Sequence, residues 1–341
     1  MKNRLGLGLL VLTLFASLSA RSLATFRNHI MPDALAVDDR QLYICEGFAV
    51  FIYSLEDFSL IGRFGKRGEG PGEFKGQPRL HVRGPQILVN SPSKVSFYSK
   101  AGVLIREVAG IASGRDFVPL GDRYVGYDTQ VDGNGVRYSS IHLYDAEFKK
   151  VRTVFRYESI AQSQRGHGWH LFGKTYITPR VCDGRIVVAG DSDFVVEVFD
   201  DRGDRMFSIR REYPKVRFTA AHREKILGLY KSRPETAREY DWWEKNIHFP
   251  EYFPAVRAIY TDDRLIYVRT YGEENGRSEF FVFDSRGRPI TQTFLAVAPS
   301  QAKNAYPFMG DFSPFAIKDV TLYQLVLDEE TEEWALHAHP M

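Results

Sequence analysis

The residues best suited to chemistry in this sequence are charged side chains within otherwise apolar, strand-like runs. They are Arg79, His81, Asp116, Arg180 and Arg257. Arginine donates paired hydrogen bonds to carboxylate and phosphate groups, and His81 and Asp116 would be its polar neighbours. Three arginines against one acid leave a net positive charge. The chemistry predicted for this set is therefore the binding of an anionic ligand.

These side chains belong to a loose repeat of four short strands. In the first unit the strands are residues 33–37, 41–45, 49–53 and 59–64, and later units begin near residues 79, 116, 180, 257 and 315. Four short strands per unit are typical of a propeller blade, and units of roughly 45–50 residues suit that architecture. The sequence predicts an all-β fold, a six-bladed β-propeller with four-stranded antiparallel blades. An irregular third unit leaves seven blades as an alternative.

Alignment of the units on their first turn places the charged residues in two columns. The column of Ala34 contains Arg79, Asp116, Thr178, Arg257 and Pro314, and the column of Ala36 contains His81, Val118, Arg180, Ile259 and Ala316. Residues two apart share one face of a strand, and innermost strands line the channel of a propeller. The columns predict an electropositive channel for a carboxylate, a phosphate or an acidic sugar. In the structural alternative, the same groups bond carbonyls of neighbouring blades or bridge channel water.

A glycine-rich segment, residues 64–74 (FGKRGEGPGEF), separates the first two units. Four glycines and a proline exclude a helix or a strand interior, so the segment reads as a long turn. Its pattern, G-x-x-G-x-G-P-G-E-F, resembles the connection between blades in NHL-type and related six-bladed propellers. The resemblance implies the fold, but no ligand or reaction.

Residues 217–250 interrupt the repeat between units four and five. Ile226, Leu229 and Tyr230 follow the spacing of a helix, and a second helical run contains Trp242 and Trp243. A helical insertion at this place also resembles a group of exported bacterial six-bladed propellers of unknown function, many of them lipoproteins. The tryptophan pair either packs the insertion onto the propeller rim or forms a lid or a surface for a partner.

The first 24 residues have the pattern of an export signal. Lys2 and Arg4 precede an uncharged run from Leu5 to Leu18, which is too short for a comfortable membrane span. Small residues at Ser22 and Ala24 predict cleavage before Thr25, leaving residues 25–341 as one propeller domain with no transmembrane helix. The alternative is an uncleaved N-terminal anchor. No cysteine stands directly after the run, which excludes a lipoprotein, so we expect a periplasmic or secreted protein.

The net charge and the cysteines argue against nucleic-acid binding and against a disulfide bond. The whole chain has a net charge of +2, and loss of residues 1–24 removes three basic residues and no acid. A nearly neutral mature chain gives no support for nucleic-acid binding. The only cysteines, Cys45 and Cys182, fall in units one and four, too far apart to bridge. We expect two buried free thiols.

The sequence contains no signature of a known catalytic centre, P-loop or cysteine metal cluster. His167 and His170 lie close together but have no acid beside them, so an ordinary loop is favoured over a metal site. No cofactor is predicted. The favoured function is an exported binding or scaffold propeller whose ligand is a small anion, a glycan or a protein. The alternative is a hydrolase or lyase acting in the channel, lactonase-like or metal-assisted.

Overall fold

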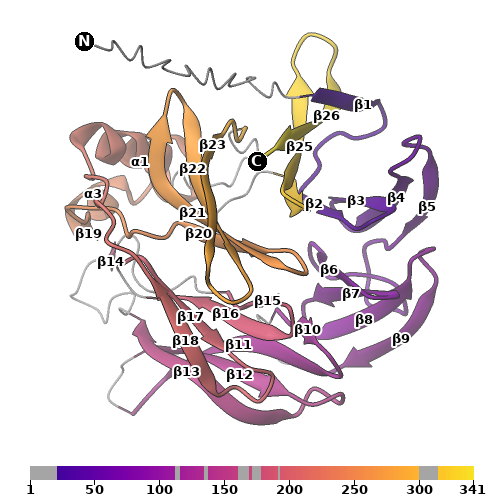
Figure 1. Cartoon of the computed structure of the whole chain (residues 1–341). Helices are drawn as coiled ribbons and strands as arrows, with labels where there is room; N and C mark the ends of the chain where they lie inside the picture. The colour runs from indigo at the N-terminus through magenta and orange to yellow at the C-terminus, as the bar shows by residue number, and fades with distance from the viewer. Residues whose placement is uncertain are drawn as a thin grey trace, which may run out of the picture.

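Six small antiparallel sheets of four strands form a ring in the computed structural model (Figure 1). The structure describes residues 21–111, 116–133, 137–159, 169–170, 178–190, 193–298 and 314–341. The predicted six-bladed β-propeller is confirmed, and the first strand of each blade is innermost. The helical insertion lies between blades four and five, as predicted.

Blades one to five are each formed by consecutive strands. The strands of blades one and two are β2 (Ala34–Val37), β3 (Gln41–Glu46), β4 (Ala49–Ser54), β5 (Leu60–Phe64), β6 (Arg79–Arg83), β7 (Gln86–Ser91), β8 (Lys94–Ser99) and β9 (Leu104–Ala109). Those of blades three to five are β10 (Val118–Leu120), β11 (Arg123–Val131), β12 (Arg137–Tyr144), β13 (Lys150–Ser159), β15 (Arg180–Cys182), β16 (Arg185–Ala189), β17 (Val195–Phe199), β18 (Arg205–Arg210), β20 (Ala258–Thr261), β21 (Leu265–Glu274), β22 (Arg277–Asp284) and β23 (Pro289–Leu295).

Blade six joins the two ends of the described chain. Its inner strands are β24 (Phe315–Lys318), β25 (Thr321–Asp328) and β26 (Glu333–Pro340), and its outermost strand is β1 (Arg21–Phe26). The ring is therefore closed by a strand from the start of the described chain, antiparallel to β26. Residues 21–24, assigned to the export signal from the sequence, form most of that strand.

The turns before the outermost strands use a recurrent aspartate motif. The Asp200 carboxylate accepts hydrogen bonds from the N–H groups two and four residues later, and Gly203 adopts a φ of 83°. Asp284 and Gly287 repeat these bonds. A side chain that caps its own turn, followed by glycine at positive φ, makes a tight hairpin. These aspartates are therefore structural.

The glycine-rich segment is a connector between blades one and two. Phe74 is fully buried, and its backbone N–H donates to Lys66 O. The Glu73 carboxylate accepts from Gly70 N, and Glu107 of β9 accepts from Gly72 N. The segment thus fixes its own turn and attaches it to blade two.

The apolar core consists of clusters packed between neighbouring blades. Cys45 packs with residues of blades one and two, and Cys182 packs in the cluster between blades four and five. Both are buried free thiols, as predicted. Burial raises the pKa of Cys182 to about 12, with a further contribution from Asp262. Neither thiol is therefore a ready nucleophile, because the thiolate is the reactive form.

The outermost strands of blades one to five contain the same irregularity. Near its start, each strand has one extra residue opposite its partner, a β-bulge. The extra residues are all apolar and 47 to 54% exposed: Ile61, Ile105, Val151, Met206 and Ile290. The five blade edges thus bend at equivalent positions.

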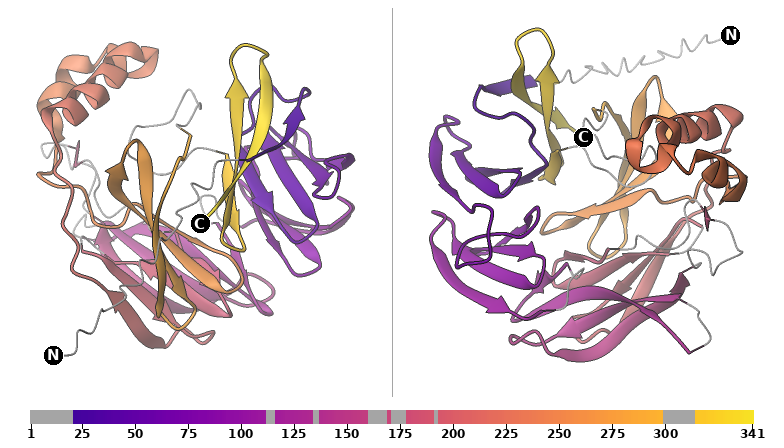
Figure 2. Two further views of the ribbon diagram at one scale, coloured as in Figure 1. Left: turned by 45° about the horizontal axis from the view of Figure 1, so that its top comes forward. Right: turned by 180° about the vertical axis from the view of Figure 1, so that it is seen from behind.

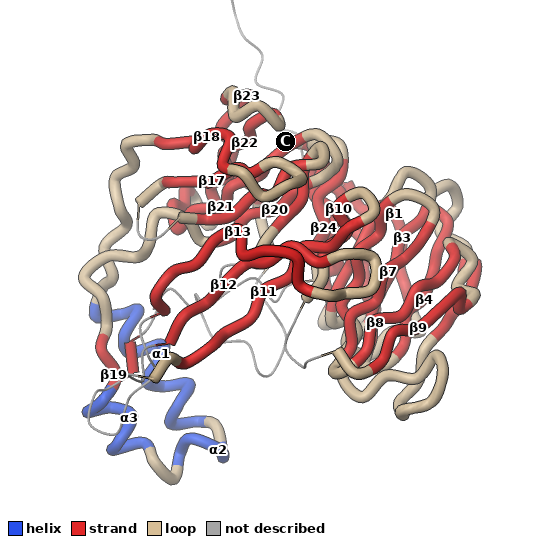
Figure 3. The backbone as a smooth tube through the Cα atoms, turned by 90° about the horizontal axis from the view of Figure 1, so that it is seen from below, coloured by secondary structure: helices blue, strands red, loops and turns tan. Residues whose placement is uncertain are grey.

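The insertion comprises α1 (Ala220–Ser232), α2 (Pro234–Ala237) and α3 (Tyr240–Asn246), followed by the short strand β19 (Ile247–His248), which pairs in parallel with β14 (Trp169–His170). The helices gather at the periphery beside blade five (Figure 2), and Figure 3 shows them away from the inner strands β20 and β24. A cluster that includes Phe218, Ile226 and Phe253 forms the insertion's own core. No helix in the described ranges is long and apolar enough to span a membrane.

Candidate functional site

Strand register tests the predicted alignment of the charged residues. In blade two, Arg83 pairs with Gln86 across a two-residue turn, and Cys182 pairs with Arg185 in the same way in blade four. Counting back from these turns puts His81 and Arg180 at equivalent positions. The predicted columns are confirmed for blades two and four.

The alignment was wrong by one residue in blade five. There the turn is closed between Asp262 and Leu265, so Ala258 and Tyr260 are the equivalents of Arg79 and His81. A shift of one residue moves a side chain to the opposite face of a strand. Arg257 therefore faces away from the columns.

Arg257 lies instead beside the insertion. Its guanidinium carbon is 5.5 Å from the centre of the Tyr271 ring, and that ring stacks on Phe253. Burial, followed by the positive charge of Arg257, lowers the pKa of Arg269 to about 9. Arg257 is thus part of a basic group in blade five, separate from the other predicted residues.

The other four predicted residues gather around the Asp116 carboxylate. His81 Nε2 is 3.1 Å from Asp116 Oδ1, and Asn90 Nδ2 donates to the same oxygen at 2.9 Å. Burial alone would raise the pKa of Asp116. The charge and hydrogen bond of His81, with the charges of Arg79 and Arg180, outweigh burial and lower it. Asp116 is therefore a buried carboxylate at ordinary pH, surrounded by cationic groups.

Arg79 and Arg180 differ in their surroundings. Arg180 Nε donates to the carbonyl of Ile259 in blade five at 3.0 Å, and Nη1 to Pro179 O at 3.4 Å. Arg180 thus bonds a carbonyl of the neighbouring blade, as in the structural alternative given with the sequence, and it joins blades four and five. Arg79 is exposed, and within the described ranges its guanidinium makes no hydrogen bond or ion pair.

A further basic residue, Arg83, escaped the sequence interpretation because it was counted as part of a turn. It shares a face of β6 with Arg79 and His81, at spacings of two residues. Its Nη2 donates to the carbonyl of Val181 in blade four, which also accepts from Thr261 of blade five. Arg83 thus crosses from blade two to blade four. The period-two spacing along β6 was the signal that could have revealed it.

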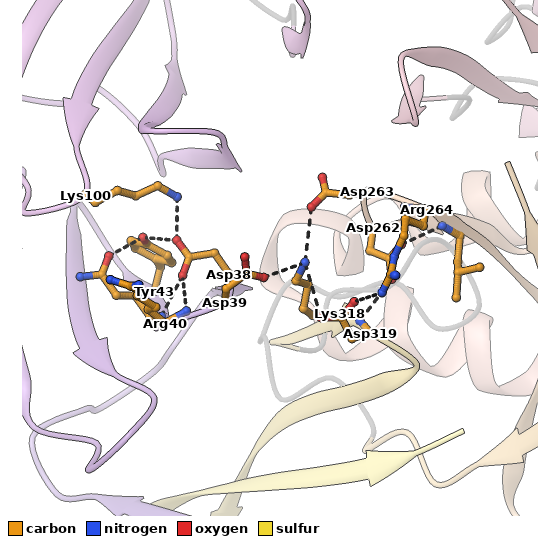
Figure 4. A network of polar contacts seen from close by, with 12 residues as sticks. Asp38, Asp39, Arg40, Tyr43, Lys100, Asp262, Asp263, Arg264, Lys318 and Asp319 are labelled. Atoms are coloured by element: carbon orange, nitrogen blue, oxygen red, sulfur yellow. Dashed lines mark hydrogen bonds and ion pairs between the residues drawn. The ribbon is translucent and has the colours of Figure 1, made fainter.

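A cavity of about 600 Å³ lies at the other end of the inner strands from Arg79 and Asp116. Turns of blades one, two, five and six line it, and two of them share the sequence Asp-Asp-Arg (Figure 4). The first aspartate of each caps its own turn: Asp38 accepts from the backbone N–H groups of Arg40 and Gln41, and Asp262 accepts from those of Arg264 and Leu265. Asp38 also accepts from Lys100 Nζ. Acids and bases are balanced there and largely satisfy one another.

Lys318 of blade six has several carboxylate partners at this cavity. Its Nζ is 3.0 Å from Asp39 Oδ1 of blade one and 3.4 Å from Asp263 Oδ2 of blade five (Figure 4). Burial would lower the pKa of Lys318, but the hydrogen bond of Asp39 and the charges of Asp263 and Asp319 raise it. Lys318 therefore attaches the closing blade to both of its neighbours.

Replacing Lys318 with methionine is expected to lower the free energy of unfolding by about 1 kcal/mol, because three carboxylates lose their shared partner. Urea unfolding followed by tryptophan fluorescence would measure this. Arg264→Met is the matched control, since Arg264 pairs with Asp319 but is 79% exposed, against 15% for Lys318. A larger loss in the control would contradict the role assigned to Lys318.

The two predicted tryptophans, Trp242 and Trp243, differ in their exposure to solvent. Trp243 packs on Tyr230 of α1, with ring centres 4.8 Å apart, so it belongs to the core of the insertion. Trp242 is 46% exposed on the outside of α3. The insertion lies at the periphery, which favours a partner surface over a lid for Trp242.

No group of three metal-binding side chains occurs in the part of the chain that the structure describes. His167 lies outside that part, and His170 is described only in its backbone. The alternative of a metal-assisted enzyme thus finds no candidate ligand set among the described residues.

No protein-family model and no curated protein matches the chain, so the NHL-type resemblance is not confirmed. Among solved structures, the chain is similar to a presumptive exported protein of Bacteroides fragilis NCTC 9343, with a TM-score of 0.51 and 10% identity over 94% of this chain and 93% of that one. The WD40 domain of Neurospora crassa Pan2 aligns with a TM-score of 0.47 and 10% identity, over 95% and 97% of the two chains. At such identity the Bacteroides structure supports the fold alone. The chain is a six-bladed β-propeller.

Proposed function

We propose that this protein is an exported binding propeller that holds a small anionic ligand beside the start of β6. The observation that carries the proposal is the exposed guanidinium of Arg79, which has no hydrogen-bond acceptor within the described ranges. A carboxylate or phosphate would satisfy it through paired hydrogen bonds. The Bacteroides neighbour, itself described as exported, shares the propeller fold.

The surroundings of Arg79 favour an anion over a neutral ligand. Asp116 is the single carboxylate of the cluster, and its charge is opposed by Arg79 and Arg180. Two arginines face one carboxylate, so the cluster has a net charge of about +1 when His81 is neutral. An excess of positive charge attracts a counter-ion, and the buried charges of Asp116 and Arg180 are screened less by solvent than exposed charges would be.

The division of roles follows from the contacts. Arg180 is held by carbonyls and contributes its charge from a fixed position, whereas Arg79 supplies the hydrogen bonds. The Asp116–Asn90 bonds hold the carboxylate in place, and the carboxylate positions His81. A positioned cationic group needs no rearrangement on binding, which favours affinity.

Arg79→Ala is expected to weaken the binding of an anion found in a carboxylate and phosphate library by about tenfold or more, because a bidentate contact contributes roughly 1.5–3 kcal/mol. Isothermal titration at fixed ionic strength would measure it. Arg40→Ala, at the opposite end of the inner strands, is the control and should bind as the unmodified protein does. Equal affinity in the Arg79 variant would refute the proposed site. Turnover of a bound ester or lactone would support the hydrolase alternative instead.

A further inference from the structure

The strand that closes the ring bears directly on how the exported chain is processed. β1 pairs with β26 from Arg21 opposite Ala338 to Phe26 opposite Trp334. Leu23 and Ala24 pack against the apolar cluster that joins blades six and one, and Phe26 is buried in it. Residues 21–24 therefore take part in both the ladder and the core of blade six.

The segment after β1 is also held firmly. The His29 side chain is fully buried, with Nδ1 3.0 Å from Glu46 Oε2 and Nε2 2.9 Å from Tyr53 Oη. Glu46 Oε1 accepts from the backbone N–H groups of Ile30 and Met31. These contacts fix the crossing from blade six to blade one, and so they fix where β1 enters the sheet.

Cleavage before Thr25 would remove most of this strand. It would take away the pairs of Arg21, Ser22 and Ala24 and the packing of Leu23, and leave a charged amine at Thr25 within the ladder. The edge of β26 would lose its partner from Leu336 to Ala338. Unpaired backbone groups beside an apolar core are costly.

We propose that processing occurs upstream of β1, by hydrolysis of a peptide bond N-terminal to Arg21. The small residues that a leader peptidase needs before its cut are present at the end of the apolar run and just after it, at Ser17, Ser19 and Ala20. Water adds its hydroxyl to the carbonyl carbon of that bond and a proton to its nitrogen. The mature chain then keeps the whole of β1.

Intact mass of the full-length chain exported by a bacterial host tests the position of the cut. A mature chain that begins at Ala20 or Arg21 supports the proposal, since both retain β1. A chain that begins at Thr25, or one that keeps the leader, overturns it. Two leader variants form a matched pair: Ser19→Leu should slow processing or move it, and Ala24→Leu should leave the site of cleavage unchanged. The reverse pattern would also overturn it.

A second measurement keeps the inference independent of the exporting host. Two leaderless chains, beginning at Arg21 and at Thr25 after an initiator methionine, are compared by thermal unfolding. The shorter chain is expected to unfold several degrees lower and to be cut faster by protease within blade six. Equal unfolding temperatures would show that residues 21–24 contribute nothing to closure and would overturn the argument.

Discussion

Gly65→Ala will lower the free energy of unfolding by about 2–5 kcal/mol, the largest loss expected here from a single added methyl group. Gly65 follows β5 with a φ of 82°, a left-handed conformation that costs alanine about 1–2 kcal/mol. Its added Cβ would lie 2.7 Å from Phe48 O and against the Phe74 ring. Phe74 is fully buried and has no room to move, so overpacking adds about 1–3 kcal/mol.

Gly84→Ala separates the two contributions. Gly84 also has a positive φ, of 56°, but nothing lies within 4 Å of an added Cβ. It should therefore show only the backbone cost of about 1–2 kcal/mol. Urea unfolding of both variants gives the difference. Equal losses would mean that the connector after blade one tolerates the methyl group and is not tightly packed.

Asp116→Asn will have two opposite effects. Removing the carboxylate leaves the cationic groups around it without a counter-charge, so the free energy of unfolding should fall by about 2 kcal/mol. The same change raises the positive charge at the proposed site, so an anion that Arg79 binds should bind at least about threefold more tightly. Loss of both stability and affinity would contradict the proposal that the cluster attracts anions.

The pH dependence of stability gives a separate test of Asp116. Its pKa is lower in the folded chain than the usual value of about 3.9, so the folded state takes up a proton less readily than the unfolded state. The stability that it contributes is present above about pH 4 and is lost as the pH falls through the lowered value. Asp116→Asn should lack this part of the acid dependence.

Asp128→Asn is the matched control for Asp116. Asp128 also pairs with a histidine, His142, at 2.9 Å, and both aspartate side chains are 11% exposed. It lies on β11 of blade three, and the proposed anion site does not include it. The control should lose stability without any gain in anion affinity. Circular dichroism and titration calorimetry on the two variants decide between these outcomes.

The fold could be predicted from the sequence because its signals are local. Residues 64–74 require a turn by their glycine content, and the Asp200–Gly203 and Asp284–Gly287 motifs encode hairpins within a few residues. Closure of the ring could not be predicted in this way. It depends on a pairing between Phe26 and Trp334, which are remote in the chain, and β1 directly follows a leader-like run.

The candidate site was predicted only in part, because strand periodicity gives the face on which a side chain lies but not its tertiary contacts. Arg79, His81, Asp116 and Arg180 gather because strand periodicity places residues two apart on one face. Arg257 was misplaced because the Asp262 turn was counted one residue too long, and a single step reverses the face. That Arg180 donates to a neighbouring carbonyl is a tertiary contact, which strand periodicity does not encode.

The five bulged outer strands affect whether two copies of the molecule can pair edge to edge. A blade ends in an edge strand, and a straight edge offers unpaired backbone groups to any other strand it meets. The extra residues at Ile61, Ile105, Val151, Met206 and Ile290 interrupt the spacing of those groups near the start of each edge. A second propeller would find no regular ladder to extend there, despite the exposed apolar side chains. The bulges thus work against edge-to-edge stacking of propellers into fibres.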